Sequence, residues 1–162
     1  MSTTGLDVFD RTLQTTHIWL DQIMEELGPD RRVAWHVLGA TLRVLRDRLT
    51  INLAAHLGAQ LPILVRGIYY DQWSPAEKRM KLHSAEEFLD MVARSLGDIR
   101  PVNVEQAVRV VFATMADHLE QGQVRKVRQA LPKSIQALWP EVQPKGTPAA
   151  TDRAPIPPDF PK

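Results

Sequence analysis

Residues 52–70 read NLAAHLGAQLPILVRGIYY, and residues 122–140 read GQVRKVRQALPKSIQALWP. The second stretch lies 70 positions after the first, so that the pair Leu61-Pro62 falls on Leu131-Pro132. The apolar side chains that recur every three or four residues also coincide: Ala54, Leu57, Leu61, Val65 and Ile68 align with Val124, Val127, Leu131, Ile135 and Leu138. Matching apolar positions at helical spacing predict that one helical unit occurs twice in the chain.

The segments before these stretches repeat in the same order. Upstream of residue 30 the offset is 69, since Leu27-Gly28 meets Leu96-Gly97, and one residue added to a loop accounts for the change. We therefore predict an all-α fold, a tandem pair of three-helix units that form one pseudo-twofold helical bundle. The positions that support the 70-residue offset are Leu38, Thr41, Leu42, Leu45 and Leu49, which align with Val108, Val111, Phe112, Met115 and Leu119.

Capping residues predict where the helices begin. The first helix is expected over residues 6–27, with Phe9 and Leu13 on its buried stripe, and the second over residues 31–48 with Asp30 as its N-cap. The third helix is expected to begin at Asn52. In the second unit the predicted starts are the capping-box pair Ser84 and Glu87, the pair Asn103 and Gln106, and Gly122 as the equivalent of Asn52.

Proline and polar segments predict the divisions of the chain. Because proline has no N–H, the third helix of each unit should kink or restart at Pro62 and Pro132. The first helical repeat is expected over residues 6–70 and the second over residues 84–140, joined by a polar connector with Trp73 as its anchor. The connector covers residues 71–83, and a disordered Pro-rich tail is expected over residues 141–162.

Composition excludes several classes of protein. The 162 residues are 44% hydrophobic and 24% charged, which is ordinary for a soluble globular protein, and they include no cysteine for a disulfide or a thiolate site. The net charge of +1 gives no general attraction to nucleic acid. The start MSTTGLDVFD has no secretory pattern, and no apolar run is long enough to span a bilayer. A cytoplasmic protein that does not bind a membrane is expected.

No pattern in the sequence predicts catalysis. The five histidines have no i, i+4 spacing or Glu-x-x-His pairing that would hold a metal, and the glycines do not form a phosphate loop. Serine and threonine lie outside any nucleophile motif. We therefore predict no catalytic residue, no metal site and no cofactor, and we favour a protein that is not an enzyme. The histidines are His17, His36, His56, His83 and His118.

The spacing of the core residues resembles a known bacterial family. The relevant residues of the second unit are Phe88-Leu89, Val92-Ala93, Leu96-Gly97, Ala107, Val110-Val111, Leu119, Ala130-Leu131-Pro132 and Leu138-Trp139. Those of the first are Leu27-Gly28, Ala40, Val44-Leu45, Leu49, Ala54-Ala55 and Ala59-Gln60-Leu61-Pro62. Over residues 16–140 they resemble the domain-of-unknown-function family numbered 2267. The resemblance implies a small, soluble all-α domain and carries over no catalytic residue.

The two units differ most in charge. Where the second unit carries the basic patch, the first carries Ala55, His56, Gly58 and Ile63 and continues to the aromatic residues Tyr69, Tyr70 and Trp73. Gln60 of the first unit is Ala130 in the second. A solvated face would explain the basic patch, and burial against the connector or the other unit would explain the small and aromatic residues. The basic patch consists of Arg125, Lys126, Arg128 and Lys133, and the ligand or partner candidates are Arg46, His56, Gln60, Arg66, Tyr69, Tyr70 and Trp73.

Three functions follow as hypotheses. The first is a protein-interaction or scaffold module that binds another protein through the aromatic and arginine residues, so that Tyr69→Ala or Trp73→Ala should keep the fold and weaken the partner. The second is a small-ligand-binding or sensor protein with a pocket between the repeats, which would need converging polar groups there. The third is a weak nucleic-acid binder through the basic patch, which the near-neutral net charge disfavours.

Overall fold

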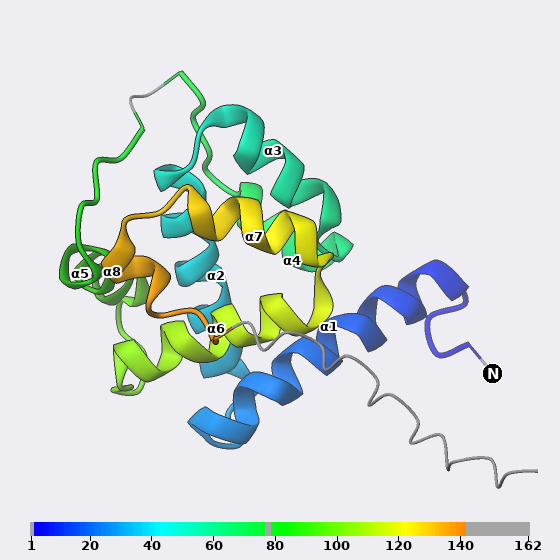
Figure 1. Ribbon diagram of the computed structural model, residues 1–162. Coiled ribbons are helices and arrows are strands. Elements are labelled where there is room, and N and C mark those ends of the chain that lie inside the picture. Colours follow the sequence, from blue (N-terminus) through cyan, green and yellow to red (C-terminus); the bar gives the residue numbers. More distant parts are fainter. Residues whose placement is uncertain (1, 77–78, 142–162) are drawn as a thin grey trace, which may run out of the picture.

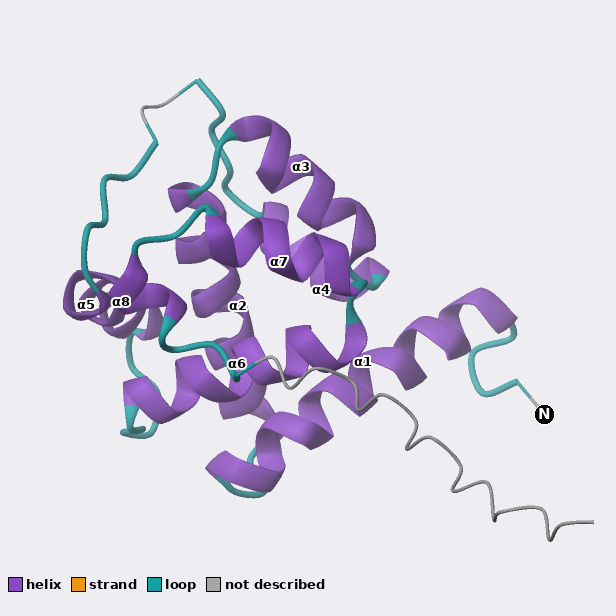
Figure 2. Ribbon diagram, in the orientation of Figure 1, coloured by secondary structure: helices purple, strands orange, loops and turns teal. Residues whose placement is uncertain are grey.

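The computed structural model describes residues 2–76 and 79–141, and these residues form eight α-helices and no strand (Figure 2). The all-α prediction is therefore confirmed. The expected tail from residue 142 onward lies outside the described residues. The helices are α1 (Asp7–Leu27), α2 (Arg31–Arg48), α3 (Ile51–Gln60), α4 (Ile63–Tyr70), α5 (Ala85–Leu96), α6 (Val104–His118), α7 (Gln121–Gln129) and α8 (Lys133–Gln136).

Three of the predicted N-caps are confirmed, because their side-chain oxygens accept from the backbone N–H three residues on. Asp30 accepts from Val33 at 3.1 Å, and Ser84 accepts from Glu87 at 3.2 Å. Asn103 accepts from Gln106 at 3.0 Å. The Glu87 carboxylate reaches back to the N–H of His83 at 2.8 Å, one residue earlier than in a standard capping box.

The predicted start of the third helix was wrong by two residues in the first unit. Thr50, and not Asn52, has extended backbone dihedrals, and its hydroxyl accepts from the N–H of Leu53 at 3.3 Å. In the second unit the N-cap position is Glu120 and not Gly122, and the Glu120 side chain makes no capping bond. The position of an N-cap depends on where the preceding helix ends. Both α2 and α6 end one residue before a buried leucine (Leu49, Leu119), and the next N-cap follows that leucine directly.

Both expected breaks at proline are confirmed. Pro62 separates α3 from α4 as the N-cap residue, and Pro132 does the same between α7 and α8. Each break is closed by a side chain from the following helix. Arg66 Nη2 donates to the Leu61 carbonyl at 2.9 Å, and Gln136 Nε2, 70 residues later, donates to the Leu131 carbonyl at 2.7 Å.

Helices from the two halves of the chain cross each other in pairs. α1 packs on α6, α5 packs on α2, and α3 lies beside α7, with α2 and α6 in contact at the centre (Figure 1). The apolar faces of these helices meet in one buried cluster that runs through both halves. Within it the Phe112 ring lies between Phe88, with centroids 5.8 Å apart, and Trp139, at 4.2 Å.

The first helix extends past this core. Trp19, Leu20 and Ile23 are buried as the periodicity predicts, but Phe9 is 53% exposed and Leu13 is 40% exposed. Figure 1 shows the first turns of α1 projecting away from the other helices. Along the described segments, none of the helices combines the length and the apolar character that crossing a bilayer requires.

Candidate functional site

The aromatic candidates of the first unit hold α4 against α3. Tyr69 is fully buried, and its hydroxyl donates to the Ala54 carbonyl at 2.6 Å, while burial raises the pKa of this phenol. Tyr70 is half-buried, donates to the Ala55 carbonyl at 3.3 Å and lies 5.4 Å from the Trp73 ring. The Tyr70 ring occupies the space where a side chain at Gly58 would lie. Burial therefore explains this aromatic group.

The arginine candidates also serve the fold. Arg46 is 4% exposed, and its Nη1 donates to the carbonyls of Tyr69 at 2.7 Å and Asp71 at 2.8 Å. Its Nε donates to Asp47 Oδ1 at 2.8 Å. Arg66 bonds the carbonyls at the C-terminus of α3 and is half-buried. Arg46 and Tyr69 thus lie in the interior, where a protein partner cannot touch them.

The remaining candidates lie on the surface without forming one site. His56 and Gln60 are exposed on α3, and Gln60 Nε2 lies 3.5 Å from Glu120 Oε2. In the basic patch Arg125, Lys126 and Lys133 are exposed, whereas Arg128 is half-buried with its Nε enclosed and without a described acceptor. The patch lies on α7 and at the start of α8, so it is separate from the buried aromatic residues of α4.

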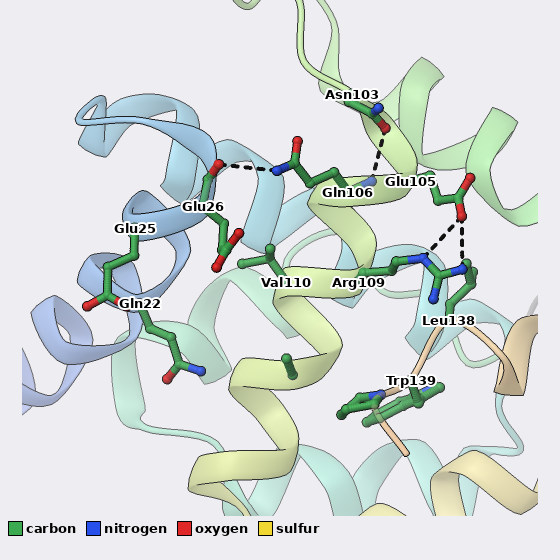
Figure 3. A pocket seen from close by; sticks show the side chains of 12 residues that line it. Gln22, Glu25, Glu26, Asn103, Glu105, Gln106, Arg109, Val110, Leu138 and Trp139 are labelled. Carbon is green, nitrogen blue, oxygen red and sulfur yellow. Dashed lines mark hydrogen bonds and ion pairs between the residues drawn. The ribbon is translucent and has the colours of Figure 1, made fainter.

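A groove lies between α1, α6 and the segment 138–140, and its lining residues are not among the site residues predicted from the sequence. Its volume is about 630 Å³. Figure 3 shows the side chains of α1 on one wall and those of α6 on the other, with Leu138 and Trp139 at one end. The lining residues are Gln22, Glu25, Glu26, Asn103, Glu105, Gln106, Arg109, Val110, Ala113, Leu138, Trp139 and Pro140.

The deeper part of the groove is apolar. Val110 and Leu138 are buried and Ala113 is half-buried, because they lie on the side of α6 and of the C-terminal segment that faces the core. Trp139 is 3% exposed and stacks on Phe112 with an interplanar angle of 10°. Its indole Nε1 is buried and has no acceptor among the described residues, which is costly for a polar group.

The rim of the groove is polar, and its one cation is already paired. Arg109 donates to Glu105 Oε1 from Nε at 3.1 Å and from Nη2 at 2.9 Å, and its Nη1 donates to the Ala137 carbonyl at 3.0 Å. Gln106 Nε2 donates to the Glu26 carbonyl at 3.3 Å and ties α6 to the end of α1. Across the described part of the chain, the carboxylates of Glu25 and Glu26 form no ion pair. The rim therefore carries negative charge.

A side-chain network closes the far end of the α1–α6 contact. The His118 ring stacks on Trp19 with centroids 5.5 Å apart, and its Nε2 lies 2.8 Å from Gln22 Oε1. Gln22 Nε2 in turn donates to Asp117 Oδ2 at 2.6 Å. These contacts fix Gln22 and hence the wall that α1 contributes to the groove.

At an offset of 70 residues, the positions of α6 that line the groove align with positions of α2. Ala113 aligns with Arg43, which is half-buried and whose pKa is lowered by burial and by the nearby Arg46. A Cβ on Gly39 would lie 2.9 Å from Arg43 Nη1 and 3.5 Å from Ile68 Cδ1, so the guanidinium covers Gly39 beside α4.

The described residues thus form an all-α protein, and a groove of the size of a small-molecule site lies between helices from the two halves of the chain. The chain belongs to DUF2267, a family of uncharacterized conserved proteins, whose model matches residues 16–138. The resemblance expected over residues 16–140 is thereby confirmed, and one continuous match covers both proposed units. No curated protein matches the sequence.

Proposed function

We propose that this protein binds a small organic ligand in the groove between α1 and α6, as a binding or sensor protein without catalysis. The observation that supports this proposal is the groove itself, since about 630 Å³ is within the range of small-molecule sites. Its apolar interior and polar rim are also typical of such sites. The walls come from segments near residues 22–26, 103–113 and 138–140. A ligand would therefore join both halves of the chain.

The lining side chains support binding more than catalysis. The described residues of the groove include three carboxylates, one guanidinium and three amides, but neither a hydroxyl nor an imidazole. Arg109 and Glu105 neutralise each other at 2.9 Å, which leaves them suited to holding a ligand in place. Amides and carboxylates at the rim can orient a ligand whose apolar part occupies the interior.

The groove would then be the product of a duplication in which one copy lost a side chain. Reciprocal packing supports this part of the proposal, because α1 on α6 and α5 on α2 exchange places when the two halves are exchanged. The contact between α3 and α7 maps onto itself. On this proposal the two units form a pseudo-twofold tandem. The short side chain of Ala113 leaves open the space that the Arg43 side chain occupies at the aligned position of the other unit.

The experiment is a ligand screen on the wild-type protein and on Ala113→Arg. A library of small molecules is tested by thermal shift, and compounds that raise the melting temperature are confirmed by native mass spectrometry. Ala113→Arg should remove this stabilisation because its side chain would occupy the groove. Ala93→Arg, which places the same charge at an exposed position of α5, is the matched control. If no compound binds in a way that depends on Ala113, the proposal is wrong.

A second candidate function is protein binding at the start of α1. The observation that favours it is the exposure of Leu6, Val8, Phe9 and Leu13, which are between 40% and 55% accessible on the projecting turns. Burying one such side chain against a partner would stabilise a complex by about 1.5–3 kcal/mol. Phe9→Ser with Leu13→Ser should abolish a cross-linked complex in cell extract, while Ile51→Ser, at a similarly exposed position of α3, should not.

A further inference from the structure

The charge of the rim indicates which chemical class the groove would accept. Glu26 of α1 is exposed, and Figure 3 shows its carboxylate directed across the groove toward Val110 of α6, whereas the carboxylate of Glu25 points away from α6. Neither has a cationic partner in the described segments. A carboxylate beside buried apolar side chains is a site for a positively charged group that carries an apolar substituent.

We propose that the ligand of this groove is an amphipathic organic cation, an amine or guanidine attached to an apolar group. This inference rests on the proposed function and names its ligand class. The ammonium or guanidinium would donate to the Glu26 carboxylate. The apolar group would lie against Val110, Ala113 and Leu138, which form the apolar interior.

The other polar groups of the rim do not favour an anion. The only cation that lines the groove within the described residues is Arg109, which Glu105 holds at 2.9 Å and the Ala137 carbonyl at 3.0 Å. The N-terminus of α6 also opens on the groove, but Asn103 already accepts from the N–H of Gln106 there. Glu105 adds a negative charge in the same turn, so an anion would meet repulsion.

Trp139 supplies a means of detecting a ligand. The residue lines the groove, its side chain is almost completely buried, and its indole N–H lacks an acceptor among the described residues. The ring rests on Phe112 and therefore has a fixed orientation. A ligand that settles beside this ring changes the magnetic environment of the indole proton, which gives one resolved signal in a nitrogen–proton correlation spectrum.

The test uses the full chain and four probes that differ in one property at a time. The probes are 2-phenylethylamine, 2-phenylethanol, phenylacetate and methylamine, and the signal of Trp139 is assigned with Trp139→Phe. We expect 2-phenylethylamine to shift this signal and to bind about tenfold more tightly than the alcohol or the carboxylate. Methylamine, which has no apolar group, should bind at least tenfold more weakly than 2-phenylethylamine.

Variants separate the contribution of each carboxylate. Glu26→Gln should weaken the binding of 2-phenylethylamine about tenfold, and Glu25→Gln should weaken it less, because that carboxylate points away from α6. Glu86→Gln, at an exposed position of α5, is the matched control and should leave the affinity unchanged. Ala113→Arg should abolish the shift.

Each outcome bears on one of the two proposals. If the alcohol or the carboxylate binds as tightly as the amine and Ala113→Arg abolishes that binding, the groove takes a ligand but the cation inference is wrong. Binding of the amine that Glu26→Gln does not change leads to the same conclusion. If none of the four probes shifts the Trp139 signal, the cation inference is also overturned, and the library screen alone decides whether the groove binds any ligand.

Discussion

Two regions of this chain, 70 residues apart, differ in the side chains at the positions of the groove, since Gly39 and Arg43 of α2 align with Arg109 and Ala113 of α6. On α2, Arg43 covers Gly39 and lies near Ile68 of α4. At the aligned positions on α6 and beyond it, Ala113, Arg109 and Leu138 line an open groove. The surrounding helices are built from matching apolar positions, so the difference is local. The same apolar pattern thus accompanies a covered surface in one region and an open groove in the other.

The aligned aromatic residues differ in a related way. The Tyr69 hydroxyl donates to the Ala54 carbonyl at 2.6 Å, so the polar atom of this buried ring is satisfied. The Trp139 indole N–H is buried beside the groove with no acceptor among the described residues. Buried polar atoms without a described partner nevertheless occur in both regions, because Thr41 Oγ1 of α2 and Arg66 Nε of α4 also have none.

The largest effect is expected from Tyr69→Ala in the filled region. Removing a fully buried ring and its hydrogen bond should lower the free energy of unfolding by about 3–5 kcal/mol. Urea denaturation followed by circular dichroism measures this change. The sequence alone led to the opposite expectation, that Tyr69→Ala keeps the fold intact. A loss below about 1 kcal/mol would contradict the conclusion that Tyr69 holds α4 against α3.

Arg46→Met tests the buried arginine that holds α4 and the following turn against α2. Methionine can fill the space but cannot donate to the carbonyls of Tyr69 and Asp71, so we expect a loss of about 2–3 kcal/mol. The matched change is Arg109→Met in the open region, whose pair with Glu105 is exposed and should contribute less than about 1 kcal/mol. Equal losses in the two variants, measured by urea denaturation, would remove the distinction between the regions.

Substitutions of two glycines, Gly58 and Gly39, test how tightly the filled region is packed. Gly58→Ala would force a methyl group into the Tyr70 ring, so we expect a loss of about 1–3 kcal/mol. Gly39→Ala needs only a shift of the flexible end of Arg43, and the better helix propensity of alanine should offset most of that cost, within about 1 kcal/mol. Thermal unfolding of both variants checks the order.

A small effect on stability is also expected from exchanging Arg43 and Ala113 between the two regions. Arg43→Ala combined with Ala113→Arg should change the unfolding free energy by less than about 1.5 kcal/mol, since both positions are half-buried. Binding of 2-phenylethylamine should be lost from the α1–α6 groove. Retention of the Trp139 signal shift in this double variant would show that Ala113 does not control access.

Local sequence signals were sufficient for the boundaries of most helices. Asp30, Ser84 and Asn103 cap their helices through residues three positions on, and a proline breaks a helix by its own chemistry, so neither depends on distant contacts. Thr50 was missed because Asn52, a stronger cap on average, stood two residues away. Periodicity predicted the buried face of α1 but could not reveal that its packing partners end before Phe9.

The candidate site depended on contacts that the sequence does not contain. The groove forms where α1 crosses α6, so its residues are drawn from positions as far apart as Gln22 and Trp139. The burial of Arg46 follows from backbone carbonyls of α4 and the following turn that a residue pattern cannot place. Arg43 and Ala113 align at the 70-residue offset, but this exchange alone does not indicate a groove.

The crossed packing of the helices has a consequence for how the chain can be divided. Neither half buries its apolar surface by itself, because α1 packs on α6 and α5 packs on α2. Residues 2–70 and 84–141, produced as separate polypeptides, should each be poorly folded alone and should reassemble when mixed. Neither fragment alone would then bind a ligand at the groove, and mixing the two fragments would restore binding.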